Sequence, residues 1–360
     1  MATSSGRCDA RCVELGFIEK REPWALASKY FPSKVGGKPA WLSLKDIPGV
    51  NQVICKNCGE PCVFLLQVYA PIDDIGDAFH RTLYVFICLS QNCVASHNEG
   101  SVIVLRSQLP LVNPFYSKDP PQSSADDADS PCARDYNPIC DVCGVLGDKK
   151  CAQCKSRSYC CKSHQVRDWR DNHKTKCRTS DPSGTETSKL LFPQFELVTE
   201  PEEEDDDDDD DVDERKRLSE YQDFVSKHPE CKESPSQLKD IQDLQNMAAT
   251  CKDKAFWKFR KETRKAPEQV LRYELGGTPL WVSSEGVPKD IPRCDCGAER
   301  RFEFQVMPQL LNTISGSDPD GVDWGTLTVF SCKKSCCCGT AYKEEYAWKQ
   351  DFSNKDDVSS

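Results

Sequence analysis

Apolar runs bounded by polar, turn-forming stretches occur in the same order near the two ends of the chain. VFLLQVY (63–69) and LYVFI (83–87) have the length and composition of β-strands and predict a two-stranded hairpin. The apolar runs inside CDCGAERRFEFQVMPQ (294–309) and GTLTVFSCKKSC (325–336) repeat this arrangement in register. The pattern therefore predicts a predominantly β (α+β) chain built from two similar halves.

The region before the second half predicts further short elements. FPQFELV predicts a strand around Phe195–Val198, and ERKRLSEYQDFVSKHPE (214–230) predicts a helix of mixed charge. DKAFWKFRKETRK (253–265) predicts a basic helix that ends at Ala266, because Pro267 suits the first turn of another helix. We expect the aromatic side chains of this helix to lie in the core: Phe256, Trp257 and Phe259.

One phrase is written twice, which indicates an internal duplication. GGKPAWLS (36–43) returns as GGTPLWVS (276–283), each time ahead of the cysteine-containing hairpin of its half. A tight Gly-Gly-x-Pro turn before a tryptophan suits a structural anchor. We therefore expect Trp41 and Trp281 to be core residues, and the two halves to pair into one domain with a shared groove between them.

Pairs of cysteines flank both predicted hairpins. Antiparallel pairing brings the start of the first strand beside the end of the second, where these pairs lie. Each half is thus predicted to hold a four-thiolate zinc-ribbon site, although buried thiols can also serve as small apolar side chains. The candidate ligands are Cys55, Cys58, Cys88 and Cys93 in the first half, and Cys294, Cys296, Cys332 and Cys336 in the second, where Cys337 and Cys338 compete with Cys336.

The segment CDVCGVLGDKKCAQCKSRSYCCKSHQVRDWRDNHKTKC (140–177) contains four pairs of zinc-ligand residues in succession. Two tetrahedral zinc ions need four such pairs, and the compact solution gives pairs one and three to one ion and pairs two and four to the other. Cys161 is expected to be a bystander. The predicted ligands are Cys140, Cys143, Cys160 and His164 for the first ion, and Cys151, Cys154, His173 and Cys177 for the second.

Composition places the chain in a reducing compartment. Its 23 cysteines are clustered, the first residues lack the apolar stretch of a secretory signal, and no apolar run approaches the length that spans a bilayer. The net charge of −11 is local, because the chain outside one acidic run carries about +1. That run is expected to be disordered and to bind a basic partner: Glu202, Glu203, Glu204, Asp205, Asp206, Asp207, Asp208, Asp209, Asp210, Asp211, Asp213 and Glu214.

These features predict a domain order along the chain. Stretches rich in Pro, Ser and Asp separate the folded pieces as linkers. The order is a first half (8–116), a linker (117–136), an inserted zinc finger (137–180), a linker with the acidic run (181–215), a second half (216–352) and a tail (353–360).

The finger spacing, with HxxxC at its end, resembles the MYND zinc finger, whose usual role is docking proline-containing peptides. The whole order, from LGFIEK and GGKPAWL through the finger to FPQFEL, DKAFWKF, APEQVLRY, FEFQVMPQLL and EEYAW, resembles the programmed cell death 2 family. The resemblance implies one β-rich TYPP-type domain, and a dedicated chaperone that delivers the small-subunit ribosomal protein uS5 to 40S ribosome biogenesis. The CDC pair and the crowded CKKSCCC depart from the expected pattern.

A chaperone of this kind is expected to hold its client on exposed sheet edges in the shared groove, while the acidic run screens the client's positive charge. It would be monomeric apart from the client and would visit cytoplasm, nucleus and nucleolus. The alternative is a MYND-finger transcription or chromatin adaptor that binds proline-rich peptides. We expect no enzyme, since no nucleophile with a partnered base stands out, and neither a membrane nor nucleic acid as the main partner.

Overall fold

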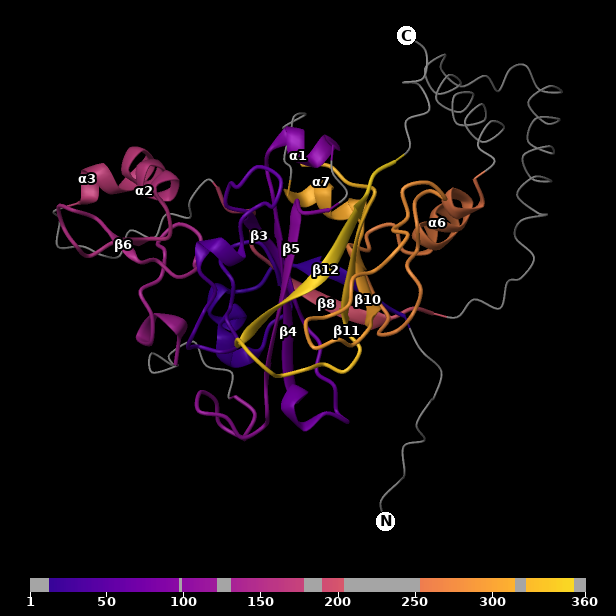
Figure 1. The fold of residues 1–360 in the computed structure, drawn as a ribbon, viewed down its shortest axis with the longest axis horizontal. Helices are drawn as coiled ribbons and strands as arrows, with labels where there is room; N and C mark the ends of the chain where they lie inside the picture. Colours follow the sequence, from indigo (N-terminus) through magenta and orange to yellow (C-terminus); the bar gives the residue numbers. More distant parts are fainter. Residues whose placement is uncertain are drawn as a thin grey trace, which may run out of the picture.

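The strands of both halves belong to one closed β-barrel (Figure 1). The computed structural model describes residues 13–96, 99–121, 131–177, 190–203, 253–314 and 322–352. The barrel order is β1-β8-β2-β3-β4-β5-β12-β11-β10-β9, with β9 returning to β1. Its strands are β1 (Glu14–Glu19), β2 (Lys34–Val35), β3 (Val63–Tyr69), β4 (His80–Ile87), β5 (Val102–Leu109), β8 (Phe195–Pro201), β9 (Leu271–Tyr273), β10 (Arg300–Val306), β11 (Thr326–Cys332) and β12 (Tyr342–Gln350).

Two antiparallel junctions join the halves into this barrel. β5 pairs with β12, from Ser107 opposite Tyr342 to Val104 opposite Glu345, and β1 pairs with β9. Strand β8, which follows the finger, lies between β1 and β2. Closure of a sheet pairs its edges. The mostly β prediction is confirmed, but the barrel strands close on themselves, so the exposed edges expected to hold a client are absent from the barrel.

The predicted hairpins form, and each gains a third strand. β3-β4-β5 and β10-β11-β12 are both antiparallel meanders. Both first pairs contain a register shift, between Phe64 and Leu66 and between Phe302 and Phe304. Because β5 and β12 run antiparallel, corresponding ends of the two meanders face opposite ends of the barrel.

Strand β4 shows why the apolar runs are continuous rather than alternating. Every residue of β4 is buried. Leu83, Val85 and Ile87 belong to one apolar cluster with residues of β10 and β11, inside the barrel. Tyr84 and Phe86 belong to a second cluster on the outer face, which includes Trp41 and cysteines of the finger. A strand covered on both faces needs apolar residues at successive positions.

The barrel interior also contains ion pairs that link the halves. Arg81 of β4 forms a two-pronged salt bridge with Glu303 of β10, and both side chains are fully buried. Burial alone would raise the pKa of Glu303, but the charge of Arg81 holds it below its ordinary value. Arg106 of β5 donates to Glu345 of β12 at 2.7 Å. Sequence patterns did not identify these pairs, which cross more than 200 residues of chain.

The helices are short and lie outside the barrel. Asp253 caps the N-terminus of α6 by accepting from the Ala255 N–H, and the helix ends before Ala266 as predicted. Its aromatics are not all core, because Phe259 is buried whereas Trp257 is 36% exposed. The helices are α1 (Gln91–Ser96), α2 (Lys162–Asp168), α3 (Lys174–Lys176), α6 (Lys254–Lys265) and α7 (Leu311–Ile314), with 3-10 turns at Pro23–Leu26, Ser28–Tyr30, Val50–Gln52, Gly76–Ala78, Ala133–Asp135 and Pro308–Leu310.

The remaining predicted elements have separate outcomes. The strand expected at Phe195–Val198 is β8, which extends to Pro201. The mixed-charge helix expected at 214–230 lies outside the described residues. None of the helices in the described ranges is long and apolar enough to cross a membrane. Figure 1 shows the finger and α6 on opposite sides of the barrel.

Candidate zinc centres

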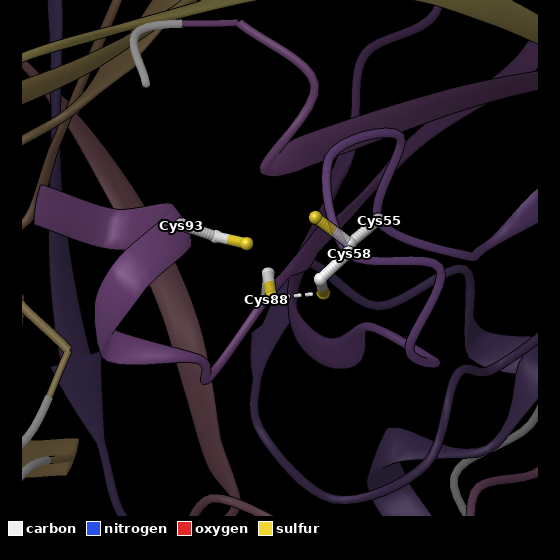
Figure 2. A group of neighbouring side chains, drawn as sticks. All are labelled: Cys55, Cys58, Cys88 and Cys93. Carbon is white, nitrogen blue, oxygen red and sulfur yellow. Dashed lines mark hydrogen bonds between the residues drawn. The ribbon is translucent and has the colours of Figure 1, made fainter. Parts of the chain in front are cut away.

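The four cysteines of the first half meet at one end of the β3–β4 hairpin. Cys55 and Cys58 come from the turn before β3, Cys88 directly follows β4, and Cys93 projects from α1 towards them (Figure 2). Their sulfur atoms all lie within 4.8 Å of one another, and Cys58 and Cys88 are 3.6 Å apart. Antiparallel pairing therefore assembles the predicted site, with a short helix supplying the last member.

The second half assembles its cysteines in the same way. Cys294 and Cys296 precede β10, Cys332 ends β11 and Cys336 lies in the following loop. All four sulfur atoms lie within 4.8 Å of one another, with Cys294–Cys336 and Cys296–Cys332 both at 3.6 Å. The tighter CDC spacing does not prevent the cluster. It lies at the barrel end opposite to the first cluster, as the antiparallel junction of the meanders requires.

The finger contains two clusters, and they interleave as predicted. Cys140, Cys143, Cys160 and His164 form one. Its Cys143 and Cys160 sulfur atoms are 3.6 Å apart, and the Nδ1 atom of His164 lies 3.1 Å from the sulfur of Cys160. A two-stranded sheet of β6 (Lys149–Lys150) and β7 (Ser158–Tyr159) lies between the Cys140–Cys143 pair and Cys160 in the chain, and its hairpin brings these ligands together. Sequence order and tertiary grouping therefore agree for the first cluster.

The second finger cluster depends on an irregular helix. Cys151 and Cys154 meet His173 and Cys177, with the Nε2 atom of His173 3.4 Å from the sulfur of Cys154. Between α2 and α3 the chain forms a π-helical turn, Trp169–His173. Such turns are rare and occur mostly at functional sites. This turn ends at His173. Its wider winding helps to direct His173 to the second cluster, whereas His164, on the same helical segment, belongs to the first.

The distances within the clusters fit zinc and exclude disulfides between the measured pairs. A tetrahedral ion with sulfur ligands at about 2.3 Å separates those ligands by about 3.8 Å. The measured sulfur separations are 3.6 Å in three clusters and 3.8 Å between Cys151 and Cys177. A disulfide requires about 2.05 Å. The donor sets, four thiolates or three thiolates with one imidazole, are those of structural zinc sites.

Local hydrogen bonds prepare several thiols to bind metal as thiolates. Burial would raise the pKa of Cys154, but hydrogen bonds from Ser156 and Arg157 bring it down to about 6. The backbone N–H of Ala298 is the largest influence on Cys296 and, with its neighbours, lowers its pKa to about 7. Metal binds the deprotonated thiol. At neutral pH Cys154 is thus largely ionised, and Cys296 about half ionised, before metal arrives.

The competing cysteines lie outside the four clusters. Cys161 caps helix α2 by accepting from the His164 N–H at 3.4 Å, in agreement with its assignment as a bystander. Cys337 and Cys338 are exposed, and Cys337 lies 3.4 Å from the Asp77 carboxylate on another loop. The ambiguity of the CKKSCCC segment is thereby resolved in favour of Cys336.

The structure places the finger against the barrel, which sequence reasoning missed. The indole N–H of Trp41 donates to the carbonyl of Gly144, directly after the Cys140–Cys143 pair, at 2.8 Å. The finger's Leu146 N–H donates to the carbonyl of Pro48. Trp41 is 2% exposed and, as predicted, lies in the core. Trp281 is partly exposed, so the expectation that it would also be a core residue is wrong.

The start of the acidic run is also tied to the barrel. The Glu202 side chain accepts from Arg272 of β9 at 2.7 Å, and the Glu202 N–H donates to the carbonyl of Val13. Glu202 therefore extends the barrel wall, which corrects the expectation that it belongs to a disordered run. Glu203 is exposed. Residues Glu204 to Glu214 lie outside the described part of the chain.

The fold and the finger define a class: a β-barrel protein with an inserted MYND-type zinc finger. Profiles for the N-terminal and C-terminal domains of programmed cell death protein 2 match residues 12–123 and 253–351, and the MYND finger profile matches residues 140–177. The chain belongs to the programmed cell death protein 2 family.

Relatives resemble the chain over most of its length. Programmed cell death protein 2 of Rattus norvegicus is 43% identical over 349 residues, which covers 94% of this chain and 96% of that protein. Programmed cell death protein 2-like of Mus musculus is 30% identical over 86% of each chain. "Probable 20S rRNA accumulation protein 4" of Schizosaccharomyces pombe is 25% identical, over 84% of this chain and 87% of that protein. No solved structure matches.

Proposed function

We propose that this protein is a dedicated chaperone, which binds newly made small-subunit ribosomal protein uS5 and delivers it for 40S ribosome biogenesis. The observation that carries the proposal is the full-length relationship to a family whose fission-yeast member is named for the accumulation of 20S rRNA. The architecture supports a binding role. The buried charged pairs hold the barrel halves together, and the cysteine clusters are structural in type.

Client capture then uses the barrel's outer surface, since strand addition to an open edge has no site in the closed barrel. The acidic stretch 203–214 would attract a basic client over long distances and in a salt-dependent manner. Mass spectrometry of proteins that co-purify at native expression, after nuclease treatment, tests the proposal. We expect uS5 near stoichiometry without other 40S proteins. Absence of uS5 from the purified complex contradicts the function.

We further propose that the chain binds four zinc ions and that its halves arose by duplication. Support comes from four clusters of suitable donors and from two meanders with equivalent cysteines and register shifts. Elemental analysis of protein purified without chelator is expected to give about four zinc ions per chain. A value near two would restrict zinc to the finger.

An adaptor function through the finger is the alternative, supported by one surface feature. A shallow depression on the finger's helical segment is lined by Lys162, Ser163, Val166, Arg167 and Arg170. Val166 is 56% exposed, so it offers an apolar contact beside the cationic side chains of this lining. Val166→Asp would abolish partner binding if the finger is the main binding site. The chaperone proposal expects uS5 binding to survive this change.

The remaining aspects of the proposal follow from this role. The protein has no catalytic step, acts as a monomer apart from its client, and moves between cytoplasm and nucleus with it. Nucleic acid and membranes are not its main partners. Fluorescent tagging at native expression should show signal in both compartments, including the nucleolus.

A further inference from the structure

The two copies of the repeated phrase form loops with equivalent hydrogen bonds. We call residues 36–43 the finger seat and residues 276–283 the C-terminal seat. In the finger seat, Gln67 of β3 binds both the N–H and, more weakly, the carbonyl of Ala40, at 2.9 and 3.4 Å. In the C-terminal seat, Gln305 of β10 binds both backbone groups of Leu280, at 2.6 and 2.9 Å. The two loops are thus anchored to the barrel in the same way, each by a strand glutamine that binds the backbone of the residue before the tryptophan.

The finger seat is occupied by other parts of the same chain. Trp41 donates its indole N–H to the carbonyl of Gly144. Gly144 has φ +82°, and a Cβ there would lie 3.0 Å from the Lys38 side chain and 3.3 Å from Pro39. The Gly37 N–H donates to the carbonyl of Phe192 at 3.0 Å. The seat therefore recognises a glycine-containing turn that presents a main-chain carbonyl to a tryptophan.

No segment in the described part of the chain covers Trp281 of the C-terminal seat as the finger covers Trp41. Trp281 is partly exposed and makes no hydrogen bond or ring contact with any residue in the described ranges, and Thr278 is exposed. Helix α6 contacts the loop through Phe259, which packs with Leu280 and Val282, and through its N-cap Asp253, which accepts from Ser283. The Gly277 N–H donates within its own turn, to the carbonyl of Glu274. The indole N–H is available for an acceptor from outside the described chain.

The charge at the two seats is opposite. Lys34, two residues before the glycines of the finger seat, donates to the carbonyl of Lys38 at 2.8 Å, and Lys38 in turn donates to the finger's Asp141 carbonyl. Glu274 occupies the place of Lys34, and its carboxylate accepts from the Thr278 N–H at 3.4 Å. The Glu274 side chain is partly exposed. A ligand of the C-terminal seat therefore meets the carboxylate of Glu274, whereas the finger meets the ammonium group of Lys38.

We propose that the C-terminal seat binds in trans what the finger seat binds in cis: a glycine-containing turn of a basic protein. Its free carbonyl would accept from the Trp281 indole, and a flanking Lys or Arg would pair with Glu274. This inference rests on the proposed function, because the basic protein is taken to be the ribosomal client. It assigns the client-contacting surface to the side of the barrel that the finger leaves open.

The NMR signals of the indole N–H protons, recorded on the full-length, zinc-loaded protein, test the C-terminal seat directly. The chain has seven tryptophans, so seven signals are expected, and Trp281→Phe and Trp41→Phe assign two of them. Without client, the Trp281 proton should exchange rapidly with water, whereas the Trp41 proton is protected by Gly144 and burial. Saturating uS5, fused to a solubility tag, should shift and protect the Trp281 signal alone of the two. An unchanged Trp281 signal overturns the proposal.

Binding measurements with the same uS5 fusion give a second test. Trp281→Ala should weaken binding about tenfold or more, and Trp281→Phe, which keeps an aromatic ring but removes the N–H and the pyrrole ring, about threefold to tenfold. Glu274→Gln should weaken binding about threefold at low salt and less at high salt. Trp24→Ala, at a tryptophan 37% exposed elsewhere, and Asp290→Asn, at an exposed carboxylate, serve as matched controls with unchanged affinity.

The outcomes separate the seat from the function. Full uS5 binding by every seat variant, with wild-type zinc content and thermal stability, overturns the seat and leaves the chaperone function intact. Failure of the wild-type chain to bind uS5 overturns both. If Trp281→Ala instead converts a self-associating chain to a monomer without changing uS5 affinity, the occupant is a second copy and the proposal is wrong.

Discussion

The finger seat and the C-terminal seat share a phrase and a set of backbone contacts, yet the tryptophan of the first is buried and that of the second is partly exposed. Trp41 packs against Tyr84 and Tyr342 with ring centroids at 4.9 and 5.0 Å, and the finger covers it. Trp281 has no such cover in the described part of the chain and remains partly exposed. The comparison indicates that contact with an inserted domain, and not the local sequence alone, sets how deeply the tryptophan of this loop is buried.

The largest effect should follow loss of a finger ligand. Cys140→Ser removes a ligand of the first finger cluster, which shares an apolar cluster with Trp41 and the N-terminal cysteines. We expect loss of zinc and a fall of more than about 4 kcal/mol in the free energy of unfolding. Elemental analysis and urea unfolding measure both. Cys161→Ser, next to a ligand, should keep full zinc content and stability; equal behaviour of the two variants contradicts the assignment.

The second prediction concerns the ion pair that joins the halves. Arg81→Met leaves Glu303 buried without its partner, which should cost about 3–5 kcal/mol. The double variant Arg81→Met with Glu303→Met removes both charges and should recover most of this loss. Urea unfolding of the four proteins in this cycle gives the coupling energy. Additive losses would show that the two charges do not depend on each other.

The two tryptophans should differ in their contribution to stability. Trp41→Ala empties a site in the core and should cost about 3–5 kcal/mol. Trp281→Ala, at a partly exposed site, should cost only about 1 kcal/mol. Paired urea unfolding curves measure the difference. Similar losses at both positions would mean that the C-terminal seat is also covered.

The smallest expected effect is a pH dependence of stability that arises from Lys34, next to the finger seat. Burial lowers the pKa of Lys34 to about 7, from an ordinary 10.5. The folded state therefore disfavours the charged ammonium of Lys34. Burying this side chain lowers the free energy of unfolding by its full amount below pH 7, and by progressively less as the pH rises towards 10.5, where the unfolded chain also loses the proton. The free energy of unfolding of Lys34→Met, measured relative to wild type, should therefore be higher at pH 7.5 than at pH 9.0 by about 2 kcal/mol.

Urea unfolding at the two pH values measures the change, with Glu274→Gln at the equivalent place of the C-terminal seat as the control. A stability difference between wild type and Lys34→Met that is the same at both pH values would show that Lys34 stays charged inside the protein.

Local spacing determined the hairpins, all four ligand clusters and the interleaving of the finger. Cys55, Cys58, Cys88 and Cys93 could be grouped because antiparallel pairing of two adjacent strands brings their flanks together, whatever surrounds them. The end of α6 before Ala266 likewise follows from a proline next in the chain. Such features rest on contacts between near neighbours in sequence or on donor chemistry, both of which the residue pattern records directly.

Only the tertiary structure decided barrel closure, the Arg81–Glu303 pair and the unequal burial of Trp41 and Trp281. Each depends on which distant segments meet, and one sequence pattern is compatible with an open sheet, two separate ribbons or a closed barrel. The identity of a charged residue or a tryptophan does not reveal whether its side chain is buried or exposed. These environments are set by long-range packing, in which the finger covers Trp41 whereas Trp281 stays partly exposed.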